Sequence, residues 1–205
     1  DDPAGPDRYS ADGLGDATLA VKWRYYRWDA PGIGTNFALL AGLELPTGSD
    51  GERDHGILLP RDLQPGSGSW DPFAGLAVTH EPGRWRFNAY TIYKRIGQGS
   101  RDANDGDQVF AELAAGNRFW LEPYPGPFMR LDLMLRYRHE GRDREGGSLI
   151  HDSGGDQATF GLNWAFRPRP ILDLQISAEV PFWQSLNGTQ LKEEFLFTVT
   201  FGYRI

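Results

Sequence analysis

One twelve-residue segment decides the fold class: MRLDLMLRYRHE, residues 129–140. Apolar side chains take every second position from Met129 to Tyr137, and most positions between them carry a charge. An amphipathic helix would space its apolar residues by three and four, whereas here they are spaced by two. The segment is therefore predicted to be a long strand with one apolar face and one charged face.

The same alternation recurs in eight other segments of the chain. They span residues 17–28, 37–45, 69–80, 85–94, 108–120, 157–166, 172–182 and 194–205. Small residues such as Ala74 and Gly116 blur the two faces in 69–80 and 108–120. The segments are mostly about ten to twelve residues long, whereas strands of soluble proteins average about five or six. Tilted strands that cross a bilayer need about 9–11 residues, so the pattern predicts an all-β, antiparallel transmembrane barrel of the bacterial outer membrane.

The connections between the predicted strands alternate between short turns and long polar loops. Turns are expected at residues 29–35, 81–84, 121–127 and 167–171, and long loops at 48–68, 96–107, 141–155 and 183–192. Outer-membrane barrels place short turns on the periplasmic side and long loops outside. Such barrels close with an even number of strands, and about nine are predicted here. We therefore expect at least one strand before Asp1, about ten to twelve strands in the full protein, and a single domain over residues 1–205.

Aromatic side chains gather at the ends of the predicted strands, as Trp28, Trp85 and Trp164 do. Their amphipathic rings suit the headgroup level of a membrane. The alternative is a soluble sandwich or lipocalin-like barrel, in which the aromatic rings fill a core. Alternation alone allows both, but long loops at one end only favour the membrane barrel.

Composition and charge exclude several other classes of protein. The net charge is −7 and the sequence pI is about 5.1, without the basic face that a nucleic-acid-binding protein needs. The chain has no cysteine, which excludes disulfides, thiolate zinc sites and cysteine nucleophiles. No apolar run approaches the about 18 residues of a membrane-spanning helix.

The polar face of the predicted barrel carries nearly balanced charges, and it is the best place to look for a functional site. Arg130, Asp132 and Arg136 lie in the middle of a predicted strand and are the first candidates for a constriction. Further candidates for the lumen are Arg138, Glu112 and Glu179. Buried charges must pair, so one interpretation is a salt-bridged lumen that stiffens the barrel. The other is a narrow polar channel with a charged constriction; a large open porin would need about 16–18 strands.

The sequence supports a catalytic or metal-binding site less well than it supports a charged lumen. Residues 151–153 read His-Asp-Ser, which supplies the serine and histidine of a lipid hydrolase. They lie in a glycine-rich loop, which does not fix the geometry of a nucleophile and its base. Residues 102–107, DANDGD, resemble a fragment of a calcium loop but lack its full ligand spacing and its final glutamate. We therefore predict no catalytic residues, no metal ligands and no cofactor, and we expect that the protein is not an enzyme.

Three sequence strings in order resemble a known family. They are GLGDATLAVKWRYYRW at 13–28, ALLAGLELPTG at 38–48 and LQPGSGSWDPFAGLA at 63–77. The order resembles the outer-membrane proteins grouped with the phenol meta-cleavage pathway, which are often labelled as transporters. This resemblance implies a barrel that passes small, often hydrophobic or aromatic, compounds. It supplies no catalytic residues.

The sequence thus predicts passive passage of small solutes, some of them hydrophobic or aromatic, across the bacterial outer membrane. The expected partners are the lipid bilayer, lipopolysaccharide and the solute, with no nucleic acid. The first alternative is a closed-lumen structural barrel that binds a protein partner in a surface complex. A barrel lipid hydrolase is a third interpretation.

Overall fold

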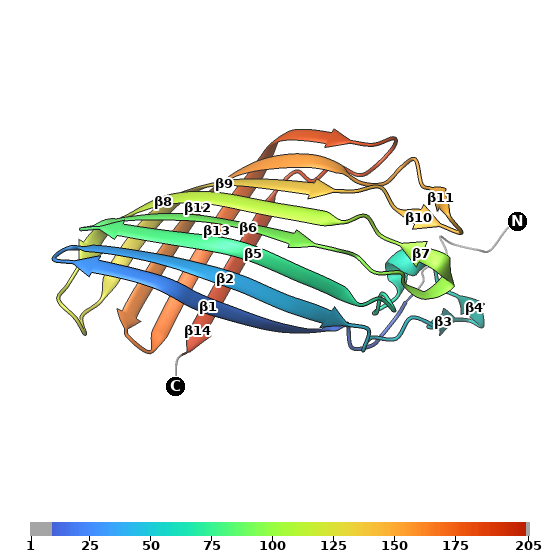
Figure 1. The fold of residues 1–205 in the computed structure, drawn as a ribbon, viewed down its shortest axis with the longest axis horizontal. Coiled ribbons are helices and arrows are strands. Elements are labelled where there is room, and N and C mark those ends of the chain that lie inside the picture. Colours follow the sequence, from blue (N-terminus) through green and yellow to red (C-terminus); the bar gives the residue numbers. More distant parts are fainter. Residues whose placement is uncertain (1–9, 204–205) are drawn as a thin grey trace, which may run out of the picture.

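The computed structural model describes residues 10–203, and its main element is one antiparallel sheet of nine long strands (Figure 1). Each strand pairs with its neighbours in chain order. The strands are β1 (Ala17–Ala30), β2 (Ile33–Leu45), β5 (Asp71–Pro82), β6 (Trp85–Lys94), β8 (Gln108–Leu121), β9 (Phe128–Glu140), β12 (Gly155–Arg169), β13 (Leu172–Leu186) and β14 (Leu196–Tyr203). The prediction of an all-β antiparallel fold with about nine strands is confirmed. The last two residues of the predicted strand 194–205 lie outside the described residues.

Several connections are shorter than the sequence predicted, and the turns expected at 81–84 and 167–171 are each reduced to two residues, 83–84 and 170–171. Residues 29–35 were expected to form a turn, but Asp29 pairs with Gly34 and Ala30 with Ile33, so the turn is only Pro31 and Gly32. Gly32 has a φ of 75°, as the residue after proline has in a type II turn. The loop expected at 183–192 also begins later, because β13 continues to Leu186.

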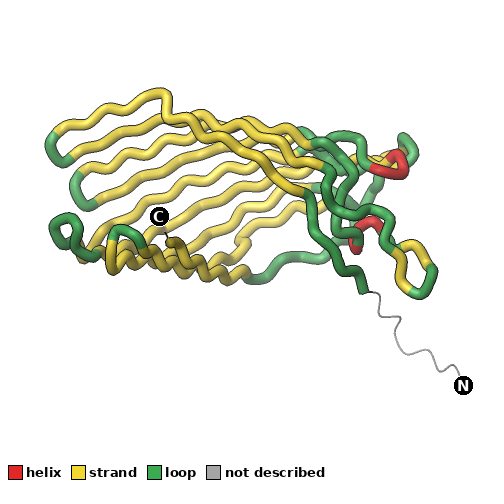
Figure 2. Tube along the Cα trace, turned by 90° about the horizontal axis from the view of Figure 1, so that it is seen from below, coloured by secondary structure: helices red, strands yellow, loops and turns green. Residues whose placement is uncertain are grey.

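Short turns lie at one end of the sheet and long loops at the other (Figure 2). We call these the turn end and the loop end. The loops contain small elements that the sequence did not predict. They are β3 (Arg53–Asp54), β4 (Ile57–Leu58), η1 (Arg61–Leu63), η2 (Ser100–Asp102), β7 (Ala103–Asn104), β10 (Arg144–Glu145) and β11 (Ser148–Leu149). Because β7 pairs with β10, the loops before β8 and after β9 are joined. The described residues contain no helix long and apolar enough to cross a membrane.

The sheet is strongly curved but not closed. In Figure 1, β13 and β14 pass behind β1 and β2 at a steep angle. Side chains from β6 and from β14, such as Arg86 and Thr198, line the same hollow of about 360 Å³, so the sheet has a concave face. Among the described strands, β1 and β14 each pair on one side only. The sheet therefore has two free edges, and a closed barrel stays a prediction.

Burial on β9 is the reverse of what a water-soluble protein shows. Leu131 and Leu133 point to the convex face and are 45% and 51% exposed, whereas Arg130 and Asp132 on the concave face are 7% and 4% exposed. The same inversion extends over the sheet, whose convex face exposes many large apolar side chains. Apolar residues of soluble proteins are usually buried and charged residues exposed.

Candidate functional site on the concave face

A salt-bridged cluster lies at the centre of the concave face. The Arg136 guanidinium of β9 donates through Nε to Glu112 Oε2 of β8 at 2.6 Å. Its Nη1 donates to Glu179 Oε1 of β13, two strands away on the other side. The carboxylate of Glu179 is 3% exposed and that of Glu112 is 12% exposed. We call these three residues the central cluster; its single cation neutralises only one of its two carboxylates.

A second buried ion pair lies next to this cluster, toward the turn end. Asp132 Oδ2 accepts from Arg130 Nε at 2.9 Å and from Asn163 Nδ2 at 2.8 Å. Asp132 Oδ1 lies 2.7 Å from Arg130 Nε but accepts no hydrogen bond from any residue that the structure describes. Both charged side chains are less than one-tenth exposed. A buried charge is costly unless it is paired and hydrogen-bonded. The ion pair lies within β9, and the hydrogen bond from Asn163 links it to β12.

Two glycines make room for these acidic side chains. Gly116 of β8 lies directly opposite Asp132, and a Cβ at this glycine would overlap with Asp132 Oδ1. Gly161 of β12 lies opposite Glu179, and a Cβ there would come within 2.9 Å of Glu179 Cγ. The small residues that blur the pattern of 108–120 therefore have a structural role. Sequence reasoning missed both glycines and Asn163, although a glycine on the polar face of a strand was a usable signal.

The structure places all six predicted lumen residues on the concave face, but it does not bring all six together. Arg138 lies one step closer to the loop end than Arg136. Its Nη2 donates to Glu140 Oε2 at 2.7 Å, and its Nη1 lies 3.6 Å from Glu193 Oε1. Arg138 therefore belongs to the loop-end entrance rather than to the central cluster. Whether any of the six forms a constriction stays a prediction.

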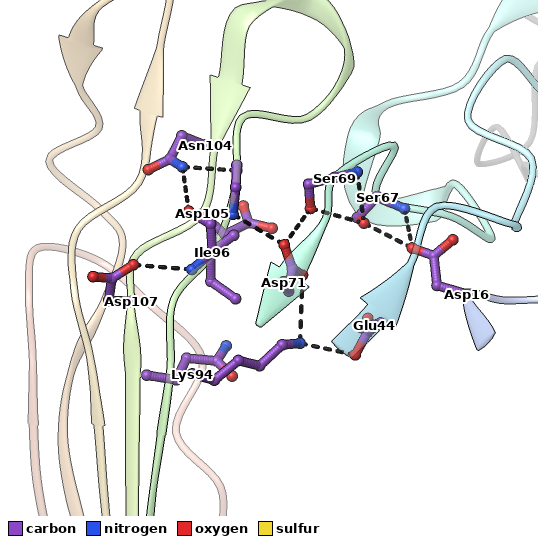
Figure 3. A network of polar contacts seen from close by, with 12 residues as sticks. Asp16, Glu44, Ser67, Ser69, Asp71, Lys94, Ile96, Asn104, Asp105 and Asp107 are labelled. Carbon is purple, nitrogen blue, oxygen red and sulfur yellow. Dashed lines mark hydrogen bonds and ion pairs between the residues drawn. The ribbon is translucent and has the colours of Figure 1, made fainter. Parts of the chain in front are cut away.

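A polar network that the sequence analysis did not predict anchors the loop end (Figure 3). Lys94 Nζ donates to Glu44 Oε2 at 2.9 Å and lies 3.5 Å from Asp71 Oδ2. Asp71, which is 2% exposed, also accepts from Ser69 Oγ at 2.7 Å and from the backbone N–H of Gly97 at 3.0 Å. The network thus ties the ends of β2, β5 and β6 to the loops above them.

Asp16 continues this network at the start of β1 (Figure 3). Its carboxylate accepts from Ser67 N and Gly48 N, both at 2.8 Å, and from Ser67 Oγ at 2.7 Å. Partial burial acts to raise the pKa of Asp16, but the hydrogen bonds from Ser67 and Gly48 outweigh it and lower the pKa. The ionised carboxylate therefore holds the long loop before β5 against β1.

The acidic segment 102–107 makes protein contacts. Asp105 lies 2.7 Å from Arg61 Nη2, and burial raises the pKa of Asp105 while Arg61 opposes this. Asp107 accepts from the backbone N–H of Ile96 at 2.9 Å, and Asn104 Nδ2 donates to the Ile96 carbonyl at 2.8 Å. Among residues 10–203, no group of three or more His, Asp or Glu side chains could hold a metal ion.

The His-Asp-Ser string at 151–153 shows no catalytic geometry in its described contacts. The Ser153 hydroxyl is buried, donates to the Ile150 carbonyl at 2.9 Å and accepts from Asp143 N at 2.9 Å. Asp152 accepts from the backbone N–H of Thr189 at 2.8 Å. These three contacts fix the conformation of the loop.

The turn end of the concave face contains a second hollow, of about 550 Å³, with a cationic lining. Arg118 contacts Glu81, and Arg86 Nε lies 3.6 Å from the same carboxylate. Arg167 pairs with Asp173 at 2.7 Å. We call this space the turn-end hollow.

Comparison with known proteins identifies a family. Residues 2–191 match the model of the family described as "Putative MetA-pathway of phenol degradation". The chain belongs to this family. The match confirms the resemblance that the strings at 13–28, 38–48 and 63–77 indicated, and it extends over the later strands, where only the alternation was visible. No match was found among curated proteins.

Proposed function

We propose that the protein is a β-barrel of the bacterial outer membrane through which small solutes pass along the concave face. In this proposal the convex face contacts lipid, the turn end faces the periplasm, and the loop end faces outward toward lipopolysaccharide. The role is passage rather than catalysis, and no cofactor takes part.

The inverted burial of β9 and its neighbours carries this proposal. A water-soluble fold would leave Leu131 and Leu133 in contact with water while it buried Arg130 and Asp132. In a bilayer the same arrangement is favourable, because lipid covers the apolar side chains and the lumen holds the charges. The strand lengths agree, since β8 has 14 residues and β9 has 13, enough to cross the hydrocarbon core with the tilt of a barrel strand.

The two free edges fit a barrel whose β1 and β14 are joined directly or through further strands. Unpaired backbone N–H and C=O groups are not tolerated in hydrocarbon, so a membrane-embedded sheet must close. Both β1 and β14 are exposed along nearly their whole length, as edge strands that await a partner would be.

The family indicates the class of solute. Its description links the family to phenol degradation, so small, partly aromatic or hydrophobic compounds are the first candidates. The hollow of about 360 Å³ beside the central cluster and the turn-end hollow of about 550 Å³ are both of the size that a small molecule fills.

The central cluster favours a second candidate, a closed-lumen barrel that serves as a scaffold for a surface complex. Arg136 reaches from β8 to β13 through its two carboxylate partners. Salt bridges along the inner wall stiffen a barrel, and charged side chains that project into the lumen also narrow the path through it.

Single-channel conductance of the full-length protein, refolded and inserted in a planar bilayer, separates the two candidates. Discrete conductance steps that change in Arg136→Ala support passage through the charged lumen. The matched control is Arg53→Ala, which removes an exposed arginine from the loop hairpin of β3 and β4 and should leave the steps unchanged.

A folded, heat-modifiable barrel that inserts but never conducts would overturn the proposed passage and favour the scaffold. Steps that are identical in the wild type, Arg136→Ala and Arg53→Ala would show that solutes do not pass the central cluster.

A further inference from the structure

Cations dominate the turn-end hollow. Its described lining includes six basic side chains, Lys22, Arg24, Arg86, Arg118, Arg130 and Arg167. Glu81 is the one carboxylate in that described lining. Asp132 and Asp173 pair with two of the arginines from just outside it. Six cations therefore face three carboxylates, and the hollow carries an excess of positive charge.

The excess charge lies mainly on β1. Lys22 and Arg24 alternate on the concave face of β1 and are exposed to the hollow. In the part of the chain that the structure describes, neither has an ion-pair partner. Across the hollow, Arg86 Nε lies 3.6 Å from Glu81 Oε1. Arg118 contacts the same carboxylate oxygen more closely. Like charges this close repel one another, and a bound anion would relieve that repulsion.

An aromatic ring gives the hollow an apolar wall beside the cations. The Arg167 guanidinium carbon lies 4.8 Å from the centroid of the Phe128 ring, and that of Arg118 lies 5.9 Å from it. The ring and the two guanidinium groups thus form one continuous surface. Ala38 and Ala77 also line the hollow, and their small side chains leave room for a flat molecule.

From this geometry we propose that the turn-end hollow binds a small organic anion that joins a carboxylate to a flat apolar body. The guanidinium fork matches both oxygens of a carboxylate, and such charge-assisted pairs are among the stronger hydrogen bonds in proteins. The apolar body of the ligand would lie against Phe128, between the arginines and the alanines. Inorganic phosphate would meet the charge but not the ring.

The binding site follows from the residues of the hollow, while its place on the path of a solute rests on the proposed function. Binding is therefore measured without transport, by titrating benzoate into the full-length protein refolded in detergent and following the heat released. Benzyl alcohol, of similar shape without the charge, and inorganic phosphate, with charge and no ring, are titrated in parallel.

The decisive variant is the double substitution Lys22→Gln/Arg24→Gln. Because these two side chains have no ion-pair partner among the described residues, the fold should survive their loss. We expect the benzoate Kd to rise at least about tenfold, the equivalent of about 1.4 kcal/mol. The matched control, Arg53→Gln/Lys192→Gln, removes one arginine and one lysine from exposed loops and should leave the Kd unchanged.

The inference is overturned if benzoate does not bind, if benzyl alcohol or phosphate binds as tightly, or if the two double variants behave alike. These results leave the proposed passage intact, since conductance is measured separately. Conversely, benzoate that binds to a barrel without conductance would support the site and contradict the passage.

Discussion

Two parts of the concave face are rich in arginine but differ in how their charges are balanced. At the centre and beside it, Arg136 and Arg130 each contact a carboxylate that is almost fully buried. At the turn end, Arg24 and Lys22 have no ion-pair partner among the described residues, and they stay exposed. Paired buried charges hold strands together, and their loss destabilises the fold. Unpaired like charges repel one another, and in our proposal a bound anion offsets that repulsion.

The largest effect on stability is expected from Asp132→Ala, which removes the carboxylate of a buried ion pair. Arg130, with a side chain only 8% exposed, would lose its carboxylate. Removing one partner of a buried pair costs about 3–5 kcal/mol, because the other charge is left uncompensated. Urea unfolding of the refolded protein, followed by tryptophan fluorescence, measures the loss.

Replacing both partners provides the control for that experiment. Arg130→Met/Asp132→Leu removes the two charges together and keeps similar volumes, so it should lose less stability than Asp132→Ala alone. A double variant that is less stable than the single one would show that the pair itself, rather than an orphaned arginine, accounts for the effect.

A smaller effect, about 2–3 kcal/mol, is expected from Gly116→Ala. The added methyl group would overlap with Asp132 Oδ1 and turn the carboxylate away from Arg130 and Asn163, although the charge stays present. Gly51→Ala is the matched control, because a Cβ at Gly51 meets nothing within 4 Å. Equal unfolding midpoints for the two variants would contradict the role that we assign to Gly116.

Gly116 also shows which features of the site the sequence can predict and which it cannot. The period of two on β9 predicts which side chains share a face, and the structure agrees from Met129 to Glu140. It cannot predict which residue of the next strand lies opposite, because a shift of register by two residues keeps every side chain on the same face. For that reason the alternation shows Gly116 only as a small residue that blurs the two faces. It does not show that the missing side chain leaves space for Asp132.

The partners of the central cluster were beyond prediction for a related reason. The contact of Arg136 with Glu112 depends on register, and its contact with Glu179 depends on the curvature that brings β13 toward β9. The loop-end strands are two residues long, too short for any periodicity to appear. The closure of the barrel is likewise beyond what alternation alone can establish.

A moderate, pH-dependent effect is expected from Asp16→Asn at the loop end, where hydrogen bonds from Ser67 and Gly48 stabilise the carboxylate. Because its pKa is lowered in the folded state, ionised Asp16 contributes stability above its ordinary value of 3.8, and this is lost as the pH falls through the lowered pKa. The variant should lose about 1 kcal/mol at pH 7.

Unfolding midpoints at pH 7 and below pH 3 test this sign. The difference between the wild type and Asp16→Asn should shrink at the lower pH. Asp12→Asn, at an exposed carboxylate nearby, should match the wild type at both values. A difference that grows as the pH falls would contradict the stabilising role of the ionised Asp16.

The smallest effect on stability is expected from Lys22→Gln/Arg24→Gln, which removes two exposed cations that have no ion-pair partner among the described residues. Because no ion pair is lost, the free energy of unfolding should change by no more than about 0.5 kcal/mol.

The salt dependence of stability provides a second test of these two cations. The Debye length falls from about 30 Å at 0.01 M to about 3 Å at 1 M. Salt therefore screens the repulsion among the cations of the turn-end hollow. The wild type should therefore gain more stability from salt than the double variant does. A loss of more than about 1 kcal/mol, or an equal response to salt, would mean that Lys22 and Arg24 are held by partners within the barrel and are not held open for an anion.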